Sequence, residues 1–411
     1  MQNVRVIAAL VLTYMLFGIL LNSVGTVILQ SIATLGETKA SASVLEAFKD
    51  LPIAVTSFLV ASFLPRLGYR RAMMLATAAV GLACIAMPLV PTFAMSKLLF
   101  AVTGIAFALV KIAVYSTIGL ITEGPERHAS LTNFIEGLFM VGVLSGYWIF
   151  SAFIDSDNPQ SLAWLDVYWP LAAVSAVIVL LLATTPLDET DARRSQSSPR
   201  EDFRSMIVLV ARPLVLVFVM SAFLYVLIEQ AIGTWLPTFN NEVLNLPQAM
   251  SVQAASIFAA ALAVGRLGAS ALLRRVGWYG LVNVCVVAMA ALTVVCLPLT
   301  QGLTVRSDST WASAPLAAYL FPMIGLFLAP IYPAINSVML SGLPRPDHAP
   351  MAGLLVVFSA LGGTTGSFVT GQVYQAFDGQ TAFYLTIVPM ALLLIALARF
   401  RKLREAADAD R

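Results

Sequence analysis

Long apolar runs follow one another along the whole chain, and short polar stretches separate them. Each run has about 20 residues or more, which is enough for a helix to cross roughly 30 Å of hydrocarbon. The pattern predicts an all-α membrane protein with twelve transmembrane helices. The expected spans are residues 5–30, 44–65, 71–91, 95–122, 130–153, 167–186, 211–239, 250–273, 279–299, 312–341, 350–376 and 380–399.

The composition agrees with this pattern, because 59% of the residues are hydrophobic and only 11% are charged. A soluble domain of this size would need more charge on its surface. The run at 5–30 is longer than the apolar core of a signal peptide and shows no small-residue cleavage site. We therefore expect it to be retained as the first membrane helix.

Clusters of residues that would support catalysis or metal binding do not occur in the sequence. Cys84, Cys285 and Cys296 all lie in apolar runs, which argues against a disulfide framework and against a zinc site. No nucleophile–base arrangement or glycine-rich phosphate loop is present. We therefore expect that the protein is not an enzyme and that it binds no cofactor, metal or nucleic acid.

A polar linker divides the chain into two halves of similar size. Residues 187–204 are the longest charged stretch between apolar runs. We expect a six-helix bundle at 1–186, a cytoplasmic linker at 187–206, a second six-helix bundle at 207–400 and a cytoplasmic tail at 401–411.

Basic residues are concentrated in alternate loops. The opposite set of loops holds only Lys39, Lys97 and Arg306, so the positive-inside rule places both termini and the linker in the cytoplasm of an inner-membrane protein. The basic loops contain Arg66, Arg70, Arg71, Arg127, the linker arginines, Arg274, Arg275, Arg345 and the tail residues Arg399, Arg401, Lys402 and Arg404.

Two short matches indicate an internal repeat of the six-helix unit. Arg66-Leu67-Gly68 after the second span corresponds to Arg275-Val276-Gly277 after the eighth. His128-Ala129 opens the fifth span and His348-Ala349 opens the eleventh, and two glycines follow each pair at the same offsets. The glycines are Gly142 and Gly146 in the first half, and Gly362 and Gly366 in the second.

Segment 61–71 (ASFLPRLGYRR) resembles the signature between helices two and three of the major facilitator superfamily. It departs from that signature at Ala61, where glycine is usual, and at Pro65, where aspartate is usual. The resemblance implies two six-helix bundles related by pseudo-twofold symmetry. The arginines of this turn and of its repeat are gating candidates, namely Arg66, Arg70, Arg71 and Arg275.

Within the superfamily, the second half is similar to the fucose–galactose–glucose proton symporter family. Segment 225–236 looks like the span-seven pattern of that family, in which an acidic residue precedes a Gly-Ser/Thr-aromatic turn. Segments 264–270, 330–339 and 354–371 are similar to its spans eight, ten and eleven. The resemblance implies proton-coupled sugar import by rocking of the two halves.

The first half departs from the sugar symporters at two positions. They carry a carboxylate in span one, where this chain offers only Asn22 as a strongly polar side chain. They carry another in span four, where this chain has Lys111. A mechanism for neutral sugars therefore does not transfer directly to this sequence.

Lys111 is the most informative charge inside an expected span. Charges in hydrocarbon are costly and are functional candidates by default. Phe107, Lys111 and Tyr115 share a helix face at four-residue spacing, and a cation between two aromatic rings suits an acidic sugar or another small carboxylate. The alternative is a structural lysine that pairs with a carboxylate on another helix.

Glu136 in span five is the expected partner of Lys111. A carboxylate whose proton affinity depends on water access and on a cationic neighbour can couple protons to transport. The alternative is a glutamate at the cytoplasmic mouth of the cavity, because Glu136 follows His128 closely in the sequence.

The second half offers its own candidates for the cavity. Glu229 and Gln230 lie deep in span seven, where Pro237 predicts a break near the end of the helix. Glu229 is a candidate for both solute binding and proton coupling, and Gln230 and Trp235 for solute contact by hydrogen bonding and stacking. The alternative for these polar residues is a purely interhelical role.

Two further residues of the second half have open roles. Arg266 could reach Glu229 or extend to the cytoplasmic surface. Asn336 lies one turn after Tyr332 in a span made irregular by prolines, and it is a cavity candidate.

Other polar residues favour ordinary structural roles. Glu46, Lys49 and Asp50 are spaced for local ion pairs near the outer surface, with an outer-gate role as the alternative. His128 and His348 are expected to be loop residues rather than pH sensors.

Together, these features predict a secondary transporter that takes up a small hydrophilic solute with protons by alternating access. A monosaccharide is the expected solute, and Lys111 extends this to acidic sugars. We expect the protein to act as a monomer in the lipid bilayer. The alternatives are proton-antiport efflux of a drug or metabolite, and a membrane sensor that binds a solute without moving it.

Overall fold

The computed structural model describes residues 2–60, 64–187, 189, 206–303, 310–344 and 347–409, and its regular elements are all helices. Eleven helices in the described chain are long and apolar enough to cross a membrane. The remaining expected span is the second, 44–65. It corresponds to α4 (Leu45–Val60), of which 16 residues are described. Residues 61–63 of that span lie outside the described residues.

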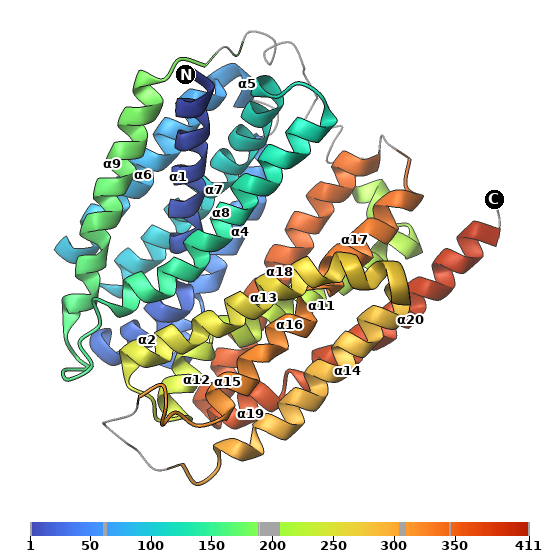
Figure 1. The fold of residues 1–411 in the computed structure, drawn as a ribbon. Coiled ribbons are helices and arrows are strands. Elements are labelled where there is room, and N and C mark those ends of the chain that lie inside the picture. Colours follow the sequence, from blue (N-terminus) through green and yellow to red (C-terminus); the bar gives the residue numbers. More distant parts are fainter. Residues whose placement is uncertain are drawn as a thin grey trace. The chain divides into compact units, whose positions relative to one another are not determined.

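The chain packs as two units. The first comprises residues 1–37 and 48–201, and in Figure 1 its long helices run side by side. Helix α1 packs on α8, and α6 packs on both α7 and α9. The elements of this unit are α1 (Gln2–Leu21), α2 (Val24–Leu35), most of α4, α5 (Leu64–Leu67), α6 (Tyr69–Leu89), α7 (Phe93–Ile121), α8 (Pro125–Ser151), the 3-10 helix η1 (Leu162–Val167) and α9 (Tyr168–Thr184).

The second unit comprises residues 38–47 and 202–411. Helix α11 packs on α18 and α20, and α13 packs on α16. The elements of this unit are α3 (Lys39–Ala42), α11 (Pro213–Gly233), α12 (Leu236–Glu242), α13 (Gln248–Val276), α14 (Trp278–Cys296), η3 (Pro298–Thr300), α15 (Ala317–Leu320), η4 (Phe321–Met323), α16 (Ile324–Leu328), α17 (Ile331–Gly342), α18 (His348–Ala376), α19 (Gly379–Tyr384) and α20 (Ile387–Ala409).

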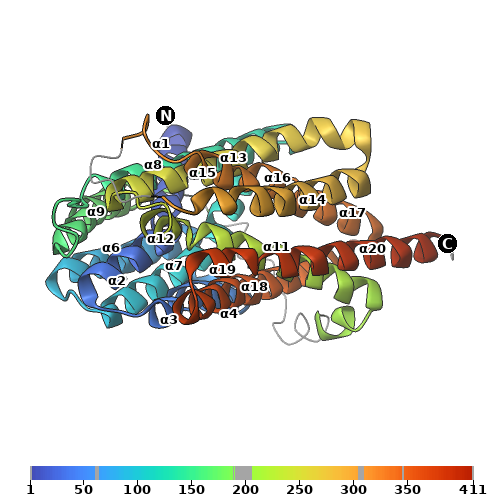
Figure 2. The ribbon, with the colours of Figure 1, turned by 90° about the horizontal axis from the view of Figure 1, so that it is seen from below.

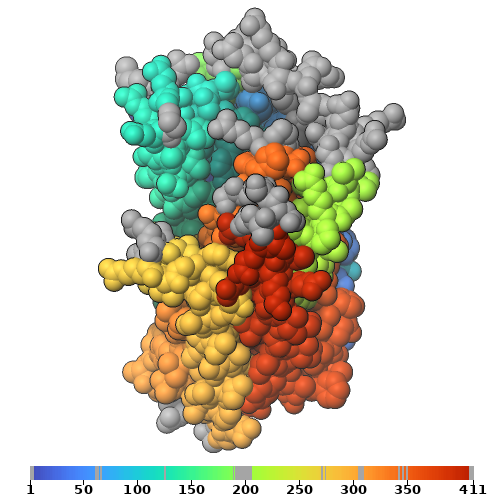
Figure 3. Space-filling model, turned by 90° about the vertical axis from the view of Figure 1, so that its right-hand side faces the viewer, coloured from blue at the N-terminus to red at the C-terminus, as the bar shows by residue number. Residues whose placement is uncertain are grey.

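Apolar side chains cover the outside of the second unit. Figure 3 shows α14 and α20, in gold and red, packed next to each other on one face. Val284 and Val287 of α14 are exposed, as are Leu392 and Ile395 of α20. Exposed apolar surface on this scale is expected where helices meet lipid rather than water.

The expected first span is two helices rather than one. Helix α1 ends at Leu21 because polar side chains take up its last carbonyl groups: Asn22 Nδ2 donates to Gly18 O at 3.0 Å, and Ser23 Oγ donates to Leu20 O at 2.8 Å. Such local bonds compete with the helical backbone pattern. Helix α2 then starts at Val24.

The last span also differs from its expected bounds. It is broken between α19 and α20, where Thr386 Oγ1 donates to Phe383 O, and α20 continues to Ala409. The segment expected as a tail from residue 401 is therefore helical as far as the structure describes it. Arg401 supports this extension through Glu405, one turn later, with an N···O distance of 2.7 Å.

The repeated glycines lie at equivalent helix contacts in the two units. A Cβ atom added to Gly142 of α8 would lie 2.5 Å from the Met15 carbonyl oxygen of α1. Gly362 of α18 meets the Phe223 carbonyl of α11 in the same way. One turn later, Gly146 of α8 contacts Ile19 of α1, and Gly366 of α18 contacts Leu227 of α11. The sequence repeat is thus a structural repeat of the α1–α8 and α11–α18 pairs.

A second pair of glycine contacts relates α4 and α7 of the first unit to α13 and α16 of the second. Gly104 of α7 abuts the backbone of Lys49, and Gly325 of α16 abuts the backbone of Phe258. The turn glycines also correspond, since Gly68 and Gly277 both adopt positive φ, at 88° and 74°. Glycine suits these turns because a side chain would be strained there.

We expect Gly142→Ala and Gly137→Ala, both on α8, to have opposite effects on stability. Alanine normally favours a helix over glycine, and no neighbour lies within 4 Å of a Cβ at position 137. At position 142 the methyl group would force α1 and α8 apart, at a cost of about 1–3 kcal/mol. Thermal unfolding in detergent should show a lower Tm for Gly142→Ala only. Equal Tm values for the two variants would contradict the close packing of α1 and α8.

Candidate functional site

A cluster of aromatic and ionisable side chains lies between α1, α7 and α8 in the first unit. The Phe107 ring of α7 packs against Phe17 of α1 at 5.8 Å between centroids, and against Phe139 of α8 at 6.0 Å. Lys111 Nζ lies 5.9 Å from the centroid of the Phe107 ring. One turn further along, the Tyr115 hydroxyl donates to Glu136 Oε1 at 2.5 Å. The face of α7 predicted from the four-residue spacing therefore points to α1 and α8.

Lys111 has no carboxylate partner among the described residues. The expected partner, Glu136, accepts its hydrogen bond from Tyr115 instead. Lys111 is exposed although it lies near the middle of the 29-residue α7. The described structure therefore does not show the ion pair between Lys111 and Glu136 that the structural alternative required.

Tyr14 of α1 borders the cluster from the other side. The Tyr14 hydroxyl is buried and makes no standard hydrogen bond in the described chain, although it is close enough to interact electrostatically with Tyr115 and Glu136.

Asn22, the residue after α1, is exposed, and its amide nitrogen donates to Gly18 O. The structure thus shows Asn22 ending the helix and does not bring it to the cluster.

The second unit has a polar cluster of its own. Arg266 Nη2 of α13 lies 3.8 Å from Glu229 Oε1 of α11, so the arginine does reach the carboxylate. Tyr225, one turn before Glu229, is buried beside this pair, and its ring centroid lies 5.2 Å from that of Tyr332 on α17. Sequence reasoning had not assigned either tyrosine to the site, although the four-residue spacing from Tyr225 to Glu229 carried the signal.

The structural repeat relates the two clusters. Lys111 follows Gly104 by seven residues and Tyr332 follows Gly325 by seven, so they occupy equivalent positions. By the same count from these glycines, Tyr115 corresponds to Asn336. Asn336 is half-buried, and its Oδ1 atom is buried with no hydrogen-bond partner among the described residues. Asn336 could therefore accept a hydrogen bond from a hydroxyl or amino group of a solute.

Gln230 and Trp235 lie at the break between α11 and α12. Gln230 Oε1 is 2.9 Å from the Thr234 hydroxyl. Trp235 is fully buried, donates from Nε1 to Ser367 O at 3.0 Å and packs on the Tyr374 ring. This geometry makes Trp235 part of the core of the unit and argues against the expected stacking on a solute.

The candidate gating arginines differ in their surroundings. The Arg70 backbone N–H donates to Glu189 Oε1 at 2.7 Å, and its guanidinium donates to Thr185 O at 3.1 Å. Arg71 and Arg275 are exposed. The side chain of Arg66 lies outside the described residues. Glu189, which the sequence did not single out, is thus the residue that holds the turn after Gly68.

The acidic and basic residues at the start of α4 are buried. Lys49 and Asp50 form the expected local ion pair, with Nζ and Oδ1 3.5 Å apart. Glu46 is fully buried, and its Oε2 lies 3.1 Å from the Thr234 hydroxyl. The spacing of these residues thus predicted the Lys49–Asp50 pair, whereas the contact of Glu46 with Thr234 depends on the tertiary structure.

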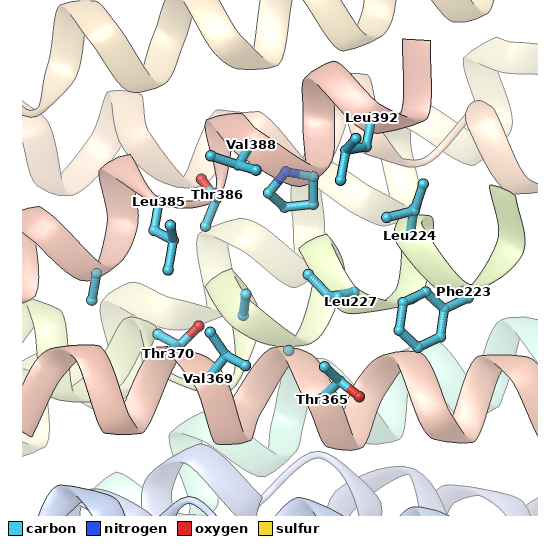
Figure 4. Close-up of a pocket in the computed structure, with 14 residues that line it drawn as sticks. Phe223, Leu224, Leu227, Thr365, Val369, Thr370, Leu385, Thr386, Val388 and Leu392 are labelled. Carbon is cyan, nitrogen blue, oxygen red and sulfur yellow. The ribbon is translucent and has the colours of Figure 1, made fainter. Parts of the chain in front are cut away.

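A separate cavity of about 280 Å³ lies between α11, α18 and the α19–α20 break. Figure 4 shows that mostly apolar side chains surround it, including Phe223, Leu227, Val369 and Leu392. No charged residue lines it, so it suits hydrocarbon and not a hydrophilic solute. In the described part of the chain, no three His, Cys, Asp or Glu residues come together to hold a metal ion.

Comparison with known proteins agrees with this architecture. The model of one protein family, described as the Major Facilitator Superfamily, matches residues 7–349. No curated protein matches the chain.

Several solved structures share the fold over nearly the whole chain. A nucleoside transporter, NupG, is 17% identical with a TM-score of 0.73, and the alignment covers 98% of this chain and 99% of that one. A D-xylose–proton symporter is 13% identical with a TM-score of 0.69, covering 97% of each chain. The transporter FucP in its outward conformation is 14% identical with a TM-score of 0.60, covering 97% and 99%. At these identities the likeness shows the fold.

Trp235→Phe should lower the stability of the protein without a specific effect on solute binding. The substitution leaves the buried Ser367 groups without the indole donor, at a cost of about 1–3 kcal/mol. Trp169→Phe is the matched control, because Trp169 is exposed. Thermal unfolding should show a lower Tm for Trp235→Phe only. An unchanged Tm together with weaker solute binding would restore the stacking role.

Proposed function

The chain belongs to the major facilitator superfamily, and from this premise we propose that it takes up a small hydrophilic solute together with protons by alternating access. The family and the structural neighbours are transporters, and the described helices make a multi-pass membrane protein. The proposed solute is a monosaccharide, and specifically an acidic sugar. The proposed solute-binding residues are Lys111 in the first unit and Glu229 and Asn336 in the second.

The observation that carries this proposal is the unpaired ammonium of Lys111 beside aromatic rings. A lysine within a membrane helix needs compensation for its lost hydration, and Glu136 does not supply it in this structure. A solute carboxylate would supply it. The Phe107 ring, within 6 Å of Nζ, offers a flat apolar surface against which the C–H face of a sugar ring can pack.

The second unit carries groups that suit the hydroxyl groups of a sugar. The Asn336 oxygen can accept from a sugar hydroxyl, and Gln230 can donate from its amide nitrogen. The neighbours named for nucleoside, fucose and xylose transport all handle ring-bearing polar solutes, which supports the same class here.

Two carboxylates are proposed to couple protons to the transport of the solute. Glu136 has the Tyr115 hydroxyl as its neighbour, and Glu229 has Arg266. Each carboxylate sits within a spanning helix next to this partner. Exchange of the partner for water or solute during the transport cycle is the proposed link between solute movement and proton transfer.

The proposal extends to orientation and assembly. We propose an inner-membrane protein that acts as a monomer. The concentration of Lys and Arg in alternate loops supports cytoplasmic termini and a cytoplasmic linker. The second candidate function is proton-antiport efflux. The absence of proline from segment 137–146 counts against it, since antiporters of this superfamily carry a Gly-Pro-rich motif in that span.

Lys111→Ala should abolish binding of an acidic sugar and leave a neutral sugar largely unaffected. Thermal-shift titration of purified protein with galacturonate and galactose measures both, because stabilisation grows with ligand concentration relative to Kd. Removing the ammonium should weaken galacturonate binding by about tenfold or more, the loss expected for a charge-assisted hydrogen bond. Lys97→Ala is the control on the same helix, where the lysine lies over Phe93. Equal losses for both sugars would contradict a carboxylate-binding role.

Proteoliposomes test the coupling and its direction. We expect labelled galacturonate to accumulate when the lumen is made alkaline relative to the outside, and Glu136→Gln to abolish the effect of the gradient while binding persists. Dissipation of the gradient with a protonophore is the control. Expulsion of preloaded solute under this same gradient, with protons entering as the solute leaves, would favour efflux by antiport. No gradient-dependent movement of any monosaccharide or sugar acid would refute the proposed solute class.

A further inference from the structure

The apolar cavity beside α11 lies wholly within the second unit. Helix α11 packs on both α18 and α20, and α19 packs on α18 (Figure 2). The residues that line the cavity come from 223–231 of α11, 365–370 of α18 and 382–392 around the α19–α20 break. Each of these segments falls inside a candidate membrane span. The cavity therefore lies at the depth of the hydrocarbon of the bilayer.

Small residues and a helix break create this space. Ala231 of α11 and Gly366 of α18 add little or no side-chain volume to its walls. A Cβ atom at Gly366 would collide with the Leu227 carbonyl, so the backbones of α11 and α18 meet at this point. On the other side, the helix is interrupted between α19 and α20, and Figure 4 shows Leu385 across the cavity from Thr370. The cavity is thus built by the path of the backbone.

The walls of the cavity are apolar. Apart from three threonines, the described lining residues are hydrocarbon side chains or glycine, and Thr386 donates its hydroxyl to Phe383 O at 2.6 Å. Water needs several polar partners to occupy a cavity, and apolar cavities stay dry. An empty space of about 280 Å³ would forfeit dispersion contacts along its whole lining. An apolar molecule from the surroundings is therefore the favoured occupant.

The cavity opens at the surface of the second unit. Val369, Val388 and Leu392 on its rim are exposed, whereas Ala231 and Thr370 on its inner wall are buried. The rim is thus apolar, and on α20 it continues the exposed outer surface that we expect to meet lipid. A hydrocarbon chain can enter from the bilayer without passing a polar group.

The lining follows the axes of the helices. On α11, Phe223, Leu227 and Ala231 line the cavity at four-residue intervals, which at 1.5 Å per residue gives a length of about 12 Å. Thr365 and Val369 line it at the same interval on α18. An apolar cavity of about 150 Å³ accepts benzene, so this one has room for a chain of roughly ten carbon atoms. An elongated slot along membrane helices suits an extended chain, because the acyl chains of lipids run in the same direction.

The charged face of α11 points away from the cavity. At about 100° per residue, Tyr225 and Glu229 lie on the side of the helix opposite Leu227 and Ala231. Glu229 has Arg266 of α13 as its neighbour there. The cavity is therefore separate from the residues proposed to bind the solute.

We infer that this cavity is a binding site for one acyl chain of a membrane phospholipid, which enters from the bilayer between α18 and α20 and lies along α11. The membrane depth, the apolar walls, the exposed rim and the elongated shape carry the inference together. Phospholipid chains are the molecules that surround the opening, and they have the length and direction that the slot requires. The inference goes beyond the proposed function and does not depend on the identity of the solute.

Photo-cross-linking in liposomes tests the site. The purified full chain is placed in phosphatidylethanolamine and phosphatidylglycerol, with a fraction of the phosphatidylglycerol carrying a diazirine in the middle of one acyl chain. Light expels N₂, the carbene inserts into a nearby C–H bond, and peptide mass spectrometry locates the adduct. Adducts in 223–231 and 385–392 should exceed those at the exposed Val284 and Val287 of α14 about threefold or more, because a pocket surrounds most of its ligand.

Two matched pairs of tryptophan variants test whether the cavity is the place of labelling. Val369→Trp and Leu392→Trp should fill the cavity and lower the adducts in 223–231 about fivefold or more. Phe368→Trp and Ile395→Trp add the same ring at exposed positions outside the lining and should leave the yield unchanged. Thermal unfolding verifies that each variant is folded, and either pair is sufficient if a member of the other does not fold.

The outcomes separate a lipid chain from other apolar ligands. Equal adduct yields in 223–231 for the filling and the control variants would overturn the proposal, as would yields no higher than those on α14. A decane that carries the same diazirine serves as the second probe. Adducts in the cavity from this decane but none from the phospholipid would show a site for small apolar molecules and would also overturn the proposal.

Discussion

Hydrocarbon cannot hydrogen-bond, and this constraint governs every part of the structure. Backbone groups within the spans are satisfied by helices, and where a helix stops early, side chains such as Asn22 and Ser23 take over its carbonyls. The same constraint makes each charge inside a span conspicuous. Glu136 accepts from Tyr115, and Glu229 lies beside Arg266, whereas Lys111 lies over the Phe107 ring and has no carboxylate partner among the described residues. The one ammonium in the described clusters that lacks a carboxylate is the group on which the proposed function depends.

The repeat explains how different side chains come to stand on one helix scaffold. Glycine contacts fix the same helix pairs in each unit, with Gly142 against α1 and Gly362 against α11. Within that common scaffold, equivalent positions have diverged: Lys111 corresponds to Tyr332, and Tyr115 corresponds to Asn336. At these positions the first unit thus offers an ammonium group and a phenol, while the second offers a phenol and an amide.

Close packing inside each unit depends on glycine. Within each unit, helices meet backbone to backbone at glycines, and such contacts leave little room for displacement. The segment at 38–47 packs within the second unit through an ion pair and longer hydrogen bonds. Polar contacts of this kind contribute less to stability than the burial of a helix face.

The sequence alone determined the helical membrane fold, the two-part organisation and the repeat, because hydrophobic length and periodicity follow directly from the bilayer. It also found Lys111, Glu136 and Glu229, since charges in apolar runs stand out without any structure. Only the tertiary structure decided which groups meet: that Tyr115 rather than Lys111 serves Glu136, that Arg266 reaches Glu229, and that Trp235 is buried. It also placed residues 38–47 on the second unit, against the order of the chain. Partner choice depends on the rotation and separation of helices far apart in sequence, and hydropathy carries no information about either.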